Sequence, residues 1–239
     1  MSQNKNRFMQ ASGRLALKAR ADLLQNSLAV WPRRGKSLLE INCGAGFFLP
    51  MFRDCGFDVT GTELAPELRA LALENVSFKA DVAAAADDHL PFEDDAFDWV
   101  ILHVAVSNTA GLAASVREAL RVAAGGLAVT FWNAASLPYV AYTLCGCKDF
   151  LPAPSHIWWR VWRLLKNLDV GRLTSLSALA GPVCTWDKQG TSAVCHACLR
   201  VLPLLGAWCL IRMDIAPAGF VTPLPLRLEK ARLVQADAM

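Results

Sequence analysis

Short apolar segments alternate with helix-forming segments between residues 36 and 132, and this order limits the fold more than any other feature. The expected strands are 36–41, 57–62, 76–80, 98–104 and 127–132. The expected helices between them are 46–55, 66–74 and 112–123, and the alanine-rich segment 82–88 fits a short helix or a loop. Strands that alternate with helices pair in parallel through right-handed crossovers. The pattern therefore predicts an α/β fold, with a doubly wound sheet covered by helices on both faces.

The segments on either side of this alternation follow other patterns. Residues 8–29 have helical spacing, and Ile157, Val161, Leu164, Leu165 and Leu168 share one face of a later helix. A strand at 183–186, a helix at 193–202 and a strand at 207–214 are expected after it. We predict a single domain over 1–216, with an N-terminal helical cap at 1–35, an aromatic-rich insert at 134–172 and an extended tail at 217–239.

Composition excludes several classes of protein. The chain has 239 residues, 54% of them hydrophobic and 19% charged, which is incompatible with disorder. Its 24 basic and 21 acidic residues give a net charge of +3, too small to indicate nucleic-acid binding. The longest apolar stretch, 201–211, is about half of what a spanning helix needs, and residues 1–10 carry no apolar signal segment. We therefore expect a cytoplasmic protein without an integral membrane segment.

The eight cysteines are expected to be thiols, most of them buried. A metal site could be sought in Cys145, Cys147, Cys195, His196 and Cys198. Structural zinc needs four ligands, usually in tightly spaced pairs, whereas this chain has one C-x-C and one distant C-H-x-C inside apolar sequence. We expect no metal.

Residues 38–48, L-L-E-I-N-C-G-A-G-F-F, run from a strand through small residues into a helix. Free N–H groups at such a turn bind anions. Glu63 stands 19 residues after Gly44 at the end of the next strand, where an acid accepts hydrogen bonds from ribose hydroxyls. The sixth position of a dinucleotide-binding loop lacks its glycine, and no Gly-Lys-Ser/Thr follows, so neither a pyrophosphate loop nor a P-loop is expected.

Five segments together resemble the successive motifs of class I S-adenosylmethionine-dependent methyltransferases. They are E-I-N-C-G-A-G (40–46), G-T-E-L-A-P (61–66), A-D-V (80–82), L-P-F-E-D-D-A-F-D-W-V (90–100) and R-E-A-L-R-V-A-A-G-G-L-A-V-T (117–130). The resemblance covers residues 36–132 and is closest to the small-molecule subgroup that includes ubiquinone and biotin pathway enzymes. It implies a Rossmann-like seven-stranded sheet in the order 3-2-1-4-5-7-6, with strand 7 antiparallel.

The resemblance also implies where S-adenosylmethionine, and its product S-adenosylhomocysteine, would bind. Glu40 and the loop of Asn42, Cys43, Gly44 and Gly46 match the residues around the methionine part of the cofactor. Glu63, followed by Leu64, matches the ribose acid, Asp81 with Val82 matches the adenine site, and His103 lies where the chain passes the methyl group. The family usually has glycine at the position of Asn42, but asparagine tolerates the left-handed backbone better than most residues.

Methyl transfer from a sulfonium is an in-line displacement that depends mainly on alignment of the reactants. A base is needed only for an acceptor that must lose a tightly held proton. His103 is the candidate base, or alternatively a wall of the cofactor site, and His156 is a second candidate.

The acceptor is expected to be a small, apolar or aromatic molecule. The insert is rich in aromatic residues, namely Tyr139, Tyr142, Phe150, Trp158, Trp159 and Trp162. They suit a lid over such a molecule. Alternatively, they pack the insert onto the sheet or form the face of a homodimer. A methyltransferase-like protein that binds cofactor or a partner without turnover is the alternative function.

Overall fold

The computed structural model describes residues 11–76, 81–104, 111–145, 156–181 and 203–215. Seven strands form one sheet: β1 (Ser37–Ile41), β2 (Asp58–Thr62), β3 (Asp81–Ala83), β4 (Phe97–His103), β5 (Ala123–Trp132), β6 (Arg172–Ala178) and β7 (Trp208–Asp214). Their order is β3-β2-β1-β4-β5-β7-β6, and β7 runs antiparallel to both of its neighbours. This confirms the predicted α/β fold and its sheet order.

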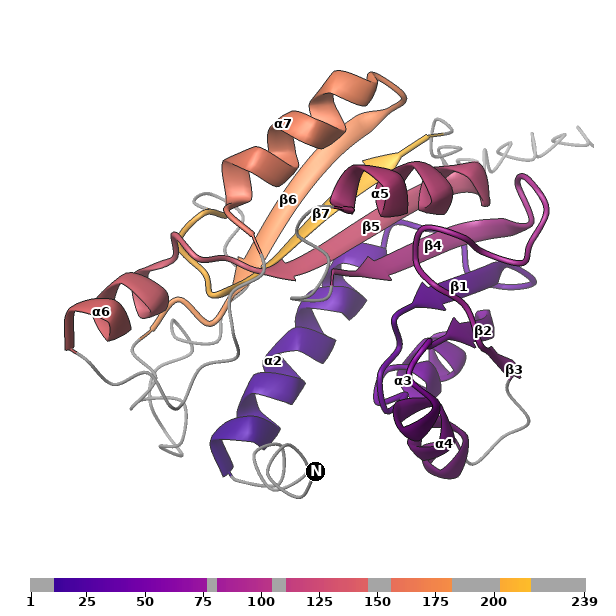
Figure 1. The fold of residues 1–239 in the computed structure, drawn as a ribbon, viewed down its shortest axis with the longest axis horizontal. Coiled ribbons are helices and arrows are strands. Elements are labelled where there is room, and N and C mark those ends of the chain that lie inside the picture. Colours follow the sequence, from indigo (N-terminus) through magenta and orange to yellow (C-terminus); the bar gives the residue numbers. More distant parts are fainter. Residues whose placement is uncertain (1–10, 77–80, 105–110, 146–155, 182–202, 216–239) are drawn as a thin grey trace, which may run out of the picture.

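Helices cover both faces of the sheet (Figure 1). They are α2 (Ala11–Leu28), α3 (Leu49–Asp54), α4 (Pro66–Asn75), α5 (Leu112–Arg121), α6 (Leu137–Cys145) and α7 (Trp158–Leu168). One core cluster joins α2 and α3 to the sheet, and a second joins α5 and α7 to the opposite face. Successive strand residues supply opposite clusters, since Leu38 belongs to the first and Leu39 to the second.

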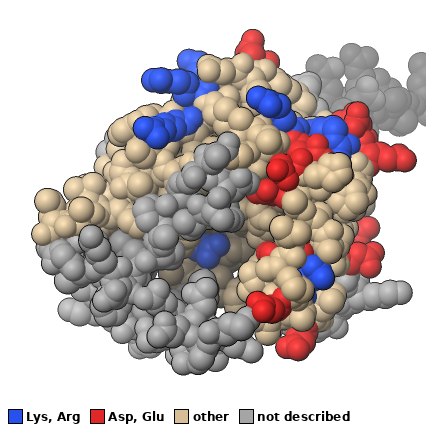
Figure 2. All heavy atoms as spheres, in the orientation of Figure 1, with Lys and Arg blue, Asp and Glu red and all other residues tan. Residues whose placement is uncertain are grey.

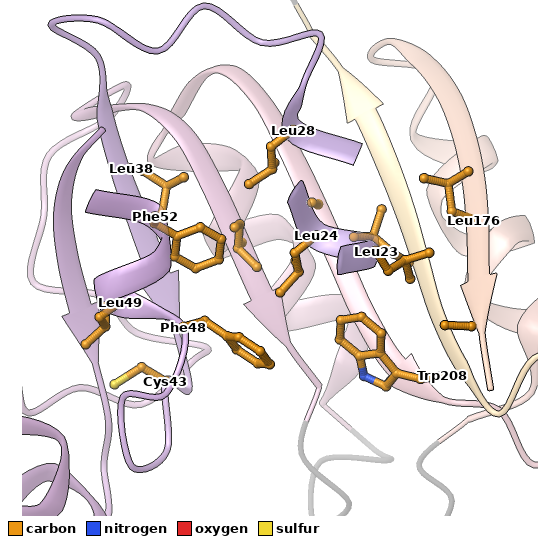
Figure 3. Close-up of a cluster of buried hydrophobic side chains, with 14 of the residues drawn as sticks. Leu23, Leu24, Leu28, Leu38, Cys43, Phe48, Leu49, Phe52, Leu176 and Trp208 are labelled. Carbon is orange, nitrogen blue, oxygen red and sulfur yellow. The ribbon is translucent and has the colours of Figure 1, made fainter. Parts of the chain in front are cut away.

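The first core cluster brings both ends of the described chain together. Leu23, Leu24 and Leu28 of α2 pack beside Leu176 of β6 and Trp208 of β7, whereas Leu38 and Phe52 complete the cluster around β1 (Figure 3). Helix α2 therefore lies over the β6–β7 side of the sheet, next to the first βα unit. It is positioned to contribute to a site at the strand ends.

Strand β5 begins earlier than predicted. The sequence predicts a helix at 112–123, which Gly125 and Gly126 would end, and a strand from 127, but both glycines lie inside β5. A Cβ atom at Gly125 would lie 2.7 Å from the carbonyl oxygen of Asp98 and 3.0 Å from the Trp99 ring. The two glycines therefore make room for Trp99, whose ring stacks on Trp31 at 4.3 Å between ring centroids. The helix signal failed here because the glycines serve packing rather than helix termination.

The other differences lie at the edges of the sheet. The described strand β3 spans Asp81–Ala83, and most of the strand expected at 76–80 lies outside the described residues. The sequence indicated no strand at β6, where serine and threonine alternate with apolar residues. The strand expected at 183–186, the helix at 193–202 and the tail at 217–239 lie outside the described residues. No helix in the described part is long and apolar enough to cross a bilayer.

Candidate active site

The loop from Asn42 to the start of α3 begins where β1 ends, at the carboxyl edge of the parallel strands. Asn42, Gly44 and Gly46 all have positive φ angles, of 59°, 59° and 70°. The backbone therefore makes the left-handed turn that the sequence predicted, and Asn42 accommodates it. A Cβ at Gly46 would lie 3.0 Å from both Cα and Cβ of Ala72, so glycine is required where α4 packs against the loop.

Cys43 anchors this loop to β2. Its backbone N–H donates to the carbonyl oxygen of Thr62 at 3.0 Å, and its side chain is buried. Burial raises the pKa of the Cys43 thiol, and the carboxylates of Glu40 and Glu63 raise it further. The thiol is therefore protonated, and it packs in the core rather than acting as a nucleophile.

Glu63 lies at the end of β2 and reaches back to the glycine loop. One carboxylate oxygen accepts from the Gly44 N–H at 2.9 Å, and the other accepts from the Ala65 N–H at 2.9 Å. The structure thus brings together the two segments that the motifs separated by 19 residues. Only 7% of Glu63 is exposed, whereas the adjacent Leu64 is 60% exposed.

A chain of polar side chains crosses the ends of β1, β4 and β5. His103 Nε2 lies 2.8 Å from Glu40 Oε1, and His103 Nδ1 lies 2.6 Å from the Thr130 hydroxyl. An ionised Glu40 can only accept, so Nε2 carries a proton, and a neutral His103 accepts at Nδ1 from Thr130. The other oxygen of Glu40 is buried without a hydrogen-bond partner among the described residues.

The Asn42 side chain ties this chain to a further acid. Its Nδ2 donates to the His103 carbonyl oxygen at 2.9 Å and to Asp87 Oδ2 at 3.1 Å. Asp87 was not singled out from the sequence, where it lies in an alanine-rich stretch. The asparagine that departs from the family pattern therefore crosslinks the β1 and β4 ends.

Asp81 occupies a different level of the sheet. It is the exposed first residue of β3 and pairs in register with Thr60, whereas Glu63 follows the end of β2. At about 3.3 Å per residue, the two acids are displaced by roughly 10 Å along the strands. Val82, the next residue, is partly buried against the α2-side core. The structure therefore does not bring Asp81 beside Glu63.

Arg20 of α2 is a site residue that the sequence did not indicate. Its guanidinium carbon lies over three rings, 5.0 Å from the centroid of Phe48, 5.6 Å from that of Trp132 and 4.9 Å from that of Trp208. Phe48 and Trp208 enter the same end of the core cluster from the glycine loop and from β7 (Figure 3). Burial lowers the pKa of the Arg20 guanidinium to about 10, although the Glu40 carboxylate opposes that change.

The surface is hollowed near the middle of the face seen in Figure 1. Figure 2 shows a basic side chain inside this hollow.

His156 also reaches the carboxyl edge. Its backbone N–H donates to the Trp132 carbonyl oxygen, and its own carbonyl oxygen accepts from Ala134. Burial lowers the pKa of the His156 ring, and the nearby charge of Arg160 lowers it further. Its Nε2 is buried without a partner among the described residues. The second candidate base is therefore a neutral imidazole with one free nitrogen.

Two of the three tryptophans on α7 hold that helix on the sheet. Trp158 and Trp162 stack with ring centroids 5.1 Å apart, and the Trp158 Nε1–H donates to the Ser175 hydroxyl on β6. Both pack against the second core cluster, whereas Trp159 is half exposed. This is the packing role that was the alternative to an aromatic lid. The side chains of Tyr142 and Cys145, and all of Cys147, Phe150, Cys195, His196 and Cys198, lie outside what the structure describes.

The comparisons with known proteins agree with this geometry. Residues 39–130 match the family model described as a methyltransferase domain. This match spans less than half of the chain and shows that its central part is similar to a methyltransferase domain. The chain is also 32% identical over 100 residues to a malonyl-[acyl-carrier protein] O-methyltransferase of Erwinia billingiae. That match covers 41% of this chain, and the chain spans only 39% of the relative's length.

Solved structures show the same fold at low sequence identity. An S-adenosylmethionine-dependent methyltransferase from Thermotoga maritima has a TM-score of 0.69 at 15% identity, over 90% of this chain and 96% of that chain. A magnesium protoporphyrin IX methyltransferase from Synechocystis with bound S-adenosylhomocysteine has a TM-score of 0.58 at 12% identity, over 90% and 95%. The chain thus has the same fold as these two enzymes, and the roles of its side chains rest on their own geometry.

Proposed function

We propose that this protein is a methyltransferase that transfers a methyl group from S-adenosylmethionine to a small, apolar or aromatic molecule. The observation that carries the proposal is the contact between Glu63 and the Gly44 N–H. It joins the left-handed glycine loop to an acid at the end of the neighbouring strand. A carboxylate in that place accepts bonds from ribose hydroxyls, as in other nucleoside-binding α/β folds.

The residues present fit the cofactor. Glu63 keeps acceptor capacity beyond its two backbone bonds, because each carboxylate oxygen has two lone pairs. The unpaired oxygen of Glu40 is suited to a cationic or N–H group near the loop. Asn42, Cys43, Gly44 and Gly46 would form the wall beside that group, with His103 opposite. When bound, the cofactor supplies an electrophilic methyl group on a sulfonium.

Two acids are candidates for the contact with the adenine ring. Asp81 with Val82 is the pair that the resemblance implies, and Leu64 is exposed next to the ribose acid. Asp87 is a second acid for that role, because its carboxylate already contacts the Asn42 side chain.

The chain contributes alignment and exclusion of water rather than leaving-group chemistry, because the departing thioether is neutral. Orientation of this kind can lower a barrier by on the order of 7–11 kcal/mol at best. Glu40 and Thr130 fix the His103 ring, and the Phe48 ring lies 5.7 Å from it, so the wall beside the proposed methyl position is rigid. His103 therefore fits the wall role. If the acceptor must lose a proton, His156 has a ring nitrogen without a partner among the described residues.

A binding titration of S-adenosylmethionine tests this proposal. Glu63→Ala should weaken binding by about 1.5–3 kcal/mol, because charge-assisted bonds to the ribose are lost. Glu63→Gln, which keeps the shape and one acceptor oxygen, should lose less. Glu67→Ala, on the exposed side of α4, is the matched control and should bind like the wild type.

Unchanged affinity in Glu63→Ala would show that the ribose site is elsewhere. Absence of binding by the wild type at millimolar cofactor would contradict the proposal. Binding without turnover of any acceptor would favour the alternative of a non-catalytic methyltransferase-like protein.

A further inference from the structure

Arg20 and Glu40 lie on the same face of the sheet. Glu40 follows Leu38 by two residues in β1, and side chains two residues apart on a strand point to the same face. Leu38 packs in the first core cluster, which joins α2 to the sheet, so the Glu40 side chain lies on the face that α2 covers. Arg20 lies on α2, with its guanidinium carbon 5.0 Å from the centroid of the Phe48 ring at the glycine loop. Both charged side chains therefore border the loop from this face.

The two side chains carry opposite charges but form no ion pair in the described part of the chain, where Glu40 pairs with His103. Their charges nevertheless interact, because the Glu40 carboxylate raises the pKa of Arg20 against the effect of burial. Each side chain also has a buried atom without a hydrogen-bond partner among the described residues, namely Oε2 of Glu40 and Nε of Arg20. Buried polar atoms are normally hydrogen-bonded. The pair therefore offers one acceptor and one donor to a ligand.

The opposite charges restrict the kind of ligand. A simple anion would be attracted by Arg20 but repelled by Glu40, and a simple cation would meet the reverse. An α-amino acid carries an ammonium group and a carboxylate on one carbon atom, so it satisfies both side chains at once. Its ammonium group donates to a carboxylate oxygen, and its carboxylate matches the planar fork of a guanidinium. The arrangement therefore fits a zwitterion.

The position of the pair indicates which zwitterion it would hold. Glu63, the proposed ribose acid, follows the end of β2, and β2 pairs with β1 so that Gly61 lies opposite Glu40. The glycine loop continues from β1 and carries Phe48, over which Arg20 lies. A nucleoside that is held at Glu63 and extends across β1 would place its far end between Glu40 and Arg20.

We propose that Arg20 and Glu40 together bind the amino-acid end of S-adenosylmethionine, with Arg20 on the carboxylate and Glu40 on the ammonium group. This inference rests on the proposed function and extends the cofactor site to α2, which lies outside the matched residues 39–130. Arg20 acts here as a specificity residue that recognises the carboxylate. Because it also lies over Trp132 and Trp208, the cofactor would link the glycine loop to the β5–β7 side of the sheet.

Calorimetric titrations without any methyl acceptor test the role of Arg20. S-adenosylhomocysteine would be compared with its decarboxylated analogue, which keeps the amine. The wild type should bind S-adenosylhomocysteine at least tenfold more tightly, because the analogue loses charge-assisted hydrogen bonds. Arg20→Met should reduce this ratio below threefold, and Arg20→Lys should keep part of it, because lysine retains the charge without the planar fork. Arg163→Met, at an exposed arginine on α7, is the matched control and should keep the full ratio.

The deaminated analogue of S-adenosylhomocysteine, which keeps the carboxylate, tests the role of Glu40 in the same way. The wild type should prefer S-adenosylhomocysteine to this analogue at least tenfold. Glu40→Gln retains an oxygen that can accept from His103, and it should reduce the preference below threefold. Arg20→Met should leave the preference above threefold, since the ammonium contact remains.

A nucleoside without the amino-acid end separates recognition from folding. 5′-Methylthioadenosine should bind the wild type, Arg20→Met and Glu40→Gln within threefold of each other. If Arg20→Met does not fold, Arg20→Gln takes its place with the same expected ratio.

Each other outcome has a definite meaning. A wild type that binds S-adenosylhomocysteine and its decarboxylated analogue equally overturns the inference, as does a tenfold ratio that survives in Arg20→Met. An equal loss of all nucleosides in a folded Arg20→Met protein also overturns it, because Arg20 would then only pack the site. If the wild type binds none of the nucleosides, the proposed function fails instead.

Discussion

Both ring nitrogens of His103 are occupied, and this limits what the residue can do. Nε2 contacts Glu40 and Nδ1 contacts Thr130, so neither nitrogen is free to take a proton from an acceptor. A base role would require one of these bonds to break first. His103 therefore acts, in the proposed reaction, by holding its ring and backbone in place beside the methyl position.

Substitution of the two histidines separates positioning from proton transfer. His103→Gln retains a polar side chain toward Glu40 and should lower kcat less than tenfold. His156→Gln should lower kcat more than tenfold at neutral pH if the acceptor must be deprotonated, because base catalysis contributes at least about 10²-fold. Steady-state rates with an accepted methyl acceptor measure both. A loss above tenfold in His103→Gln, with no effect of His156→Gln, would assign the base to His103.

The positions of individual site residues were predictable where the turn after a strand, or the shared edge of parallel strands, determines them. Asn42 has the positive φ angle that the glycine-loop pattern requires, and Glu63 meets the loop because parallel strands end at one edge. Arg20 could not be predicted, because its local sequence resembles that of Lys18, which is exposed on the same helix. What distinguishes Arg20 is contact with Trp132 and Trp208, which only the folded sheet brings near α2.

At the scale of elements, Arg121 and Glu118 fasten the end of α5 to the turn that precedes β4. Arg121 donates to the Phe92 carbonyl oxygen and to Asp94, and Glu118 accepts from the Leu90 N–H. The turn of residues 90–95, which carries the exposed acids Asp94 and Asp95, is thus fixed on a helix. These contacts, which we call the Arg121–Glu118 clamp, fix the start of β4. They therefore help to fix the position of His103 at the end of that strand.

The clamp makes stability depend on pH. The hydrogen bond from Arg121 holds the pKa of Glu118 at about 2, against the opposing effect of burial and with help from the Leu90 N–H. Because the folded-state pKa is depressed, the stabilisation is complete above about pH 4.5, the ordinary value, and is lost as pH falls toward 2. Glu118→Gln should therefore lower the free energy of unfolding by about 2 kcal/mol at pH 6, and the difference should shrink below pH 4.5.

Urea unfolding of the wild type and Glu118→Gln at pH 6, 5, 4 and 3 measures this difference. Glu67→Gln, exposed on α4, should show no such pH dependence. A constant difference between wild type and Glu118→Gln across this range would mean that the Glu118 charge contributes nothing and that only its shape matters.

The boundaries of elements were less predictable than their existence. Apolar runs located β1, β4 and β7, because strands that are buried on both faces of a sheet are nearly continuous hydrophobic segments. Strand β6 was missed because it is an edge strand whose exposed residues are polar, which leaves a weak pattern. A hydrophobic pattern in the sequence reveals a strand through its buried residues, and an edge strand such as β6 has fewer of them.

For the whole molecule, the order of strands followed from the family resemblance rather than from periodicity, because pairing between distant segments leaves no local signal. The fold brings two groups of residues to the carboxyl edge of the parallel strands, one from each half of the sheet. The glycine loop and Glu63 belong to the β1–β2 half, whereas Arg20, Trp132 and Trp208 belong to α2 and the β5–β7 half. A ligand at that edge contacts both halves and should stabilise the fold as a unit.

Thermal unfolding with S-adenosylhomocysteine tests this coupling. A ligand at 100 times its Kd stabilises the folded state by about 2.7 kcal/mol, which corresponds to a rise in Tm of roughly 5–10 °C for a chain of this size. Glu63→Ala should show a much smaller rise at the same concentration, because its Kd is weaker, and Glu67→Ala should match the wild type. A single transition that moves as a whole indicates that the ligand holds both halves together. Two transitions, with only one responding to the ligand, would show that the α2 and β5–β7 side unfolds independently of the glycine loop.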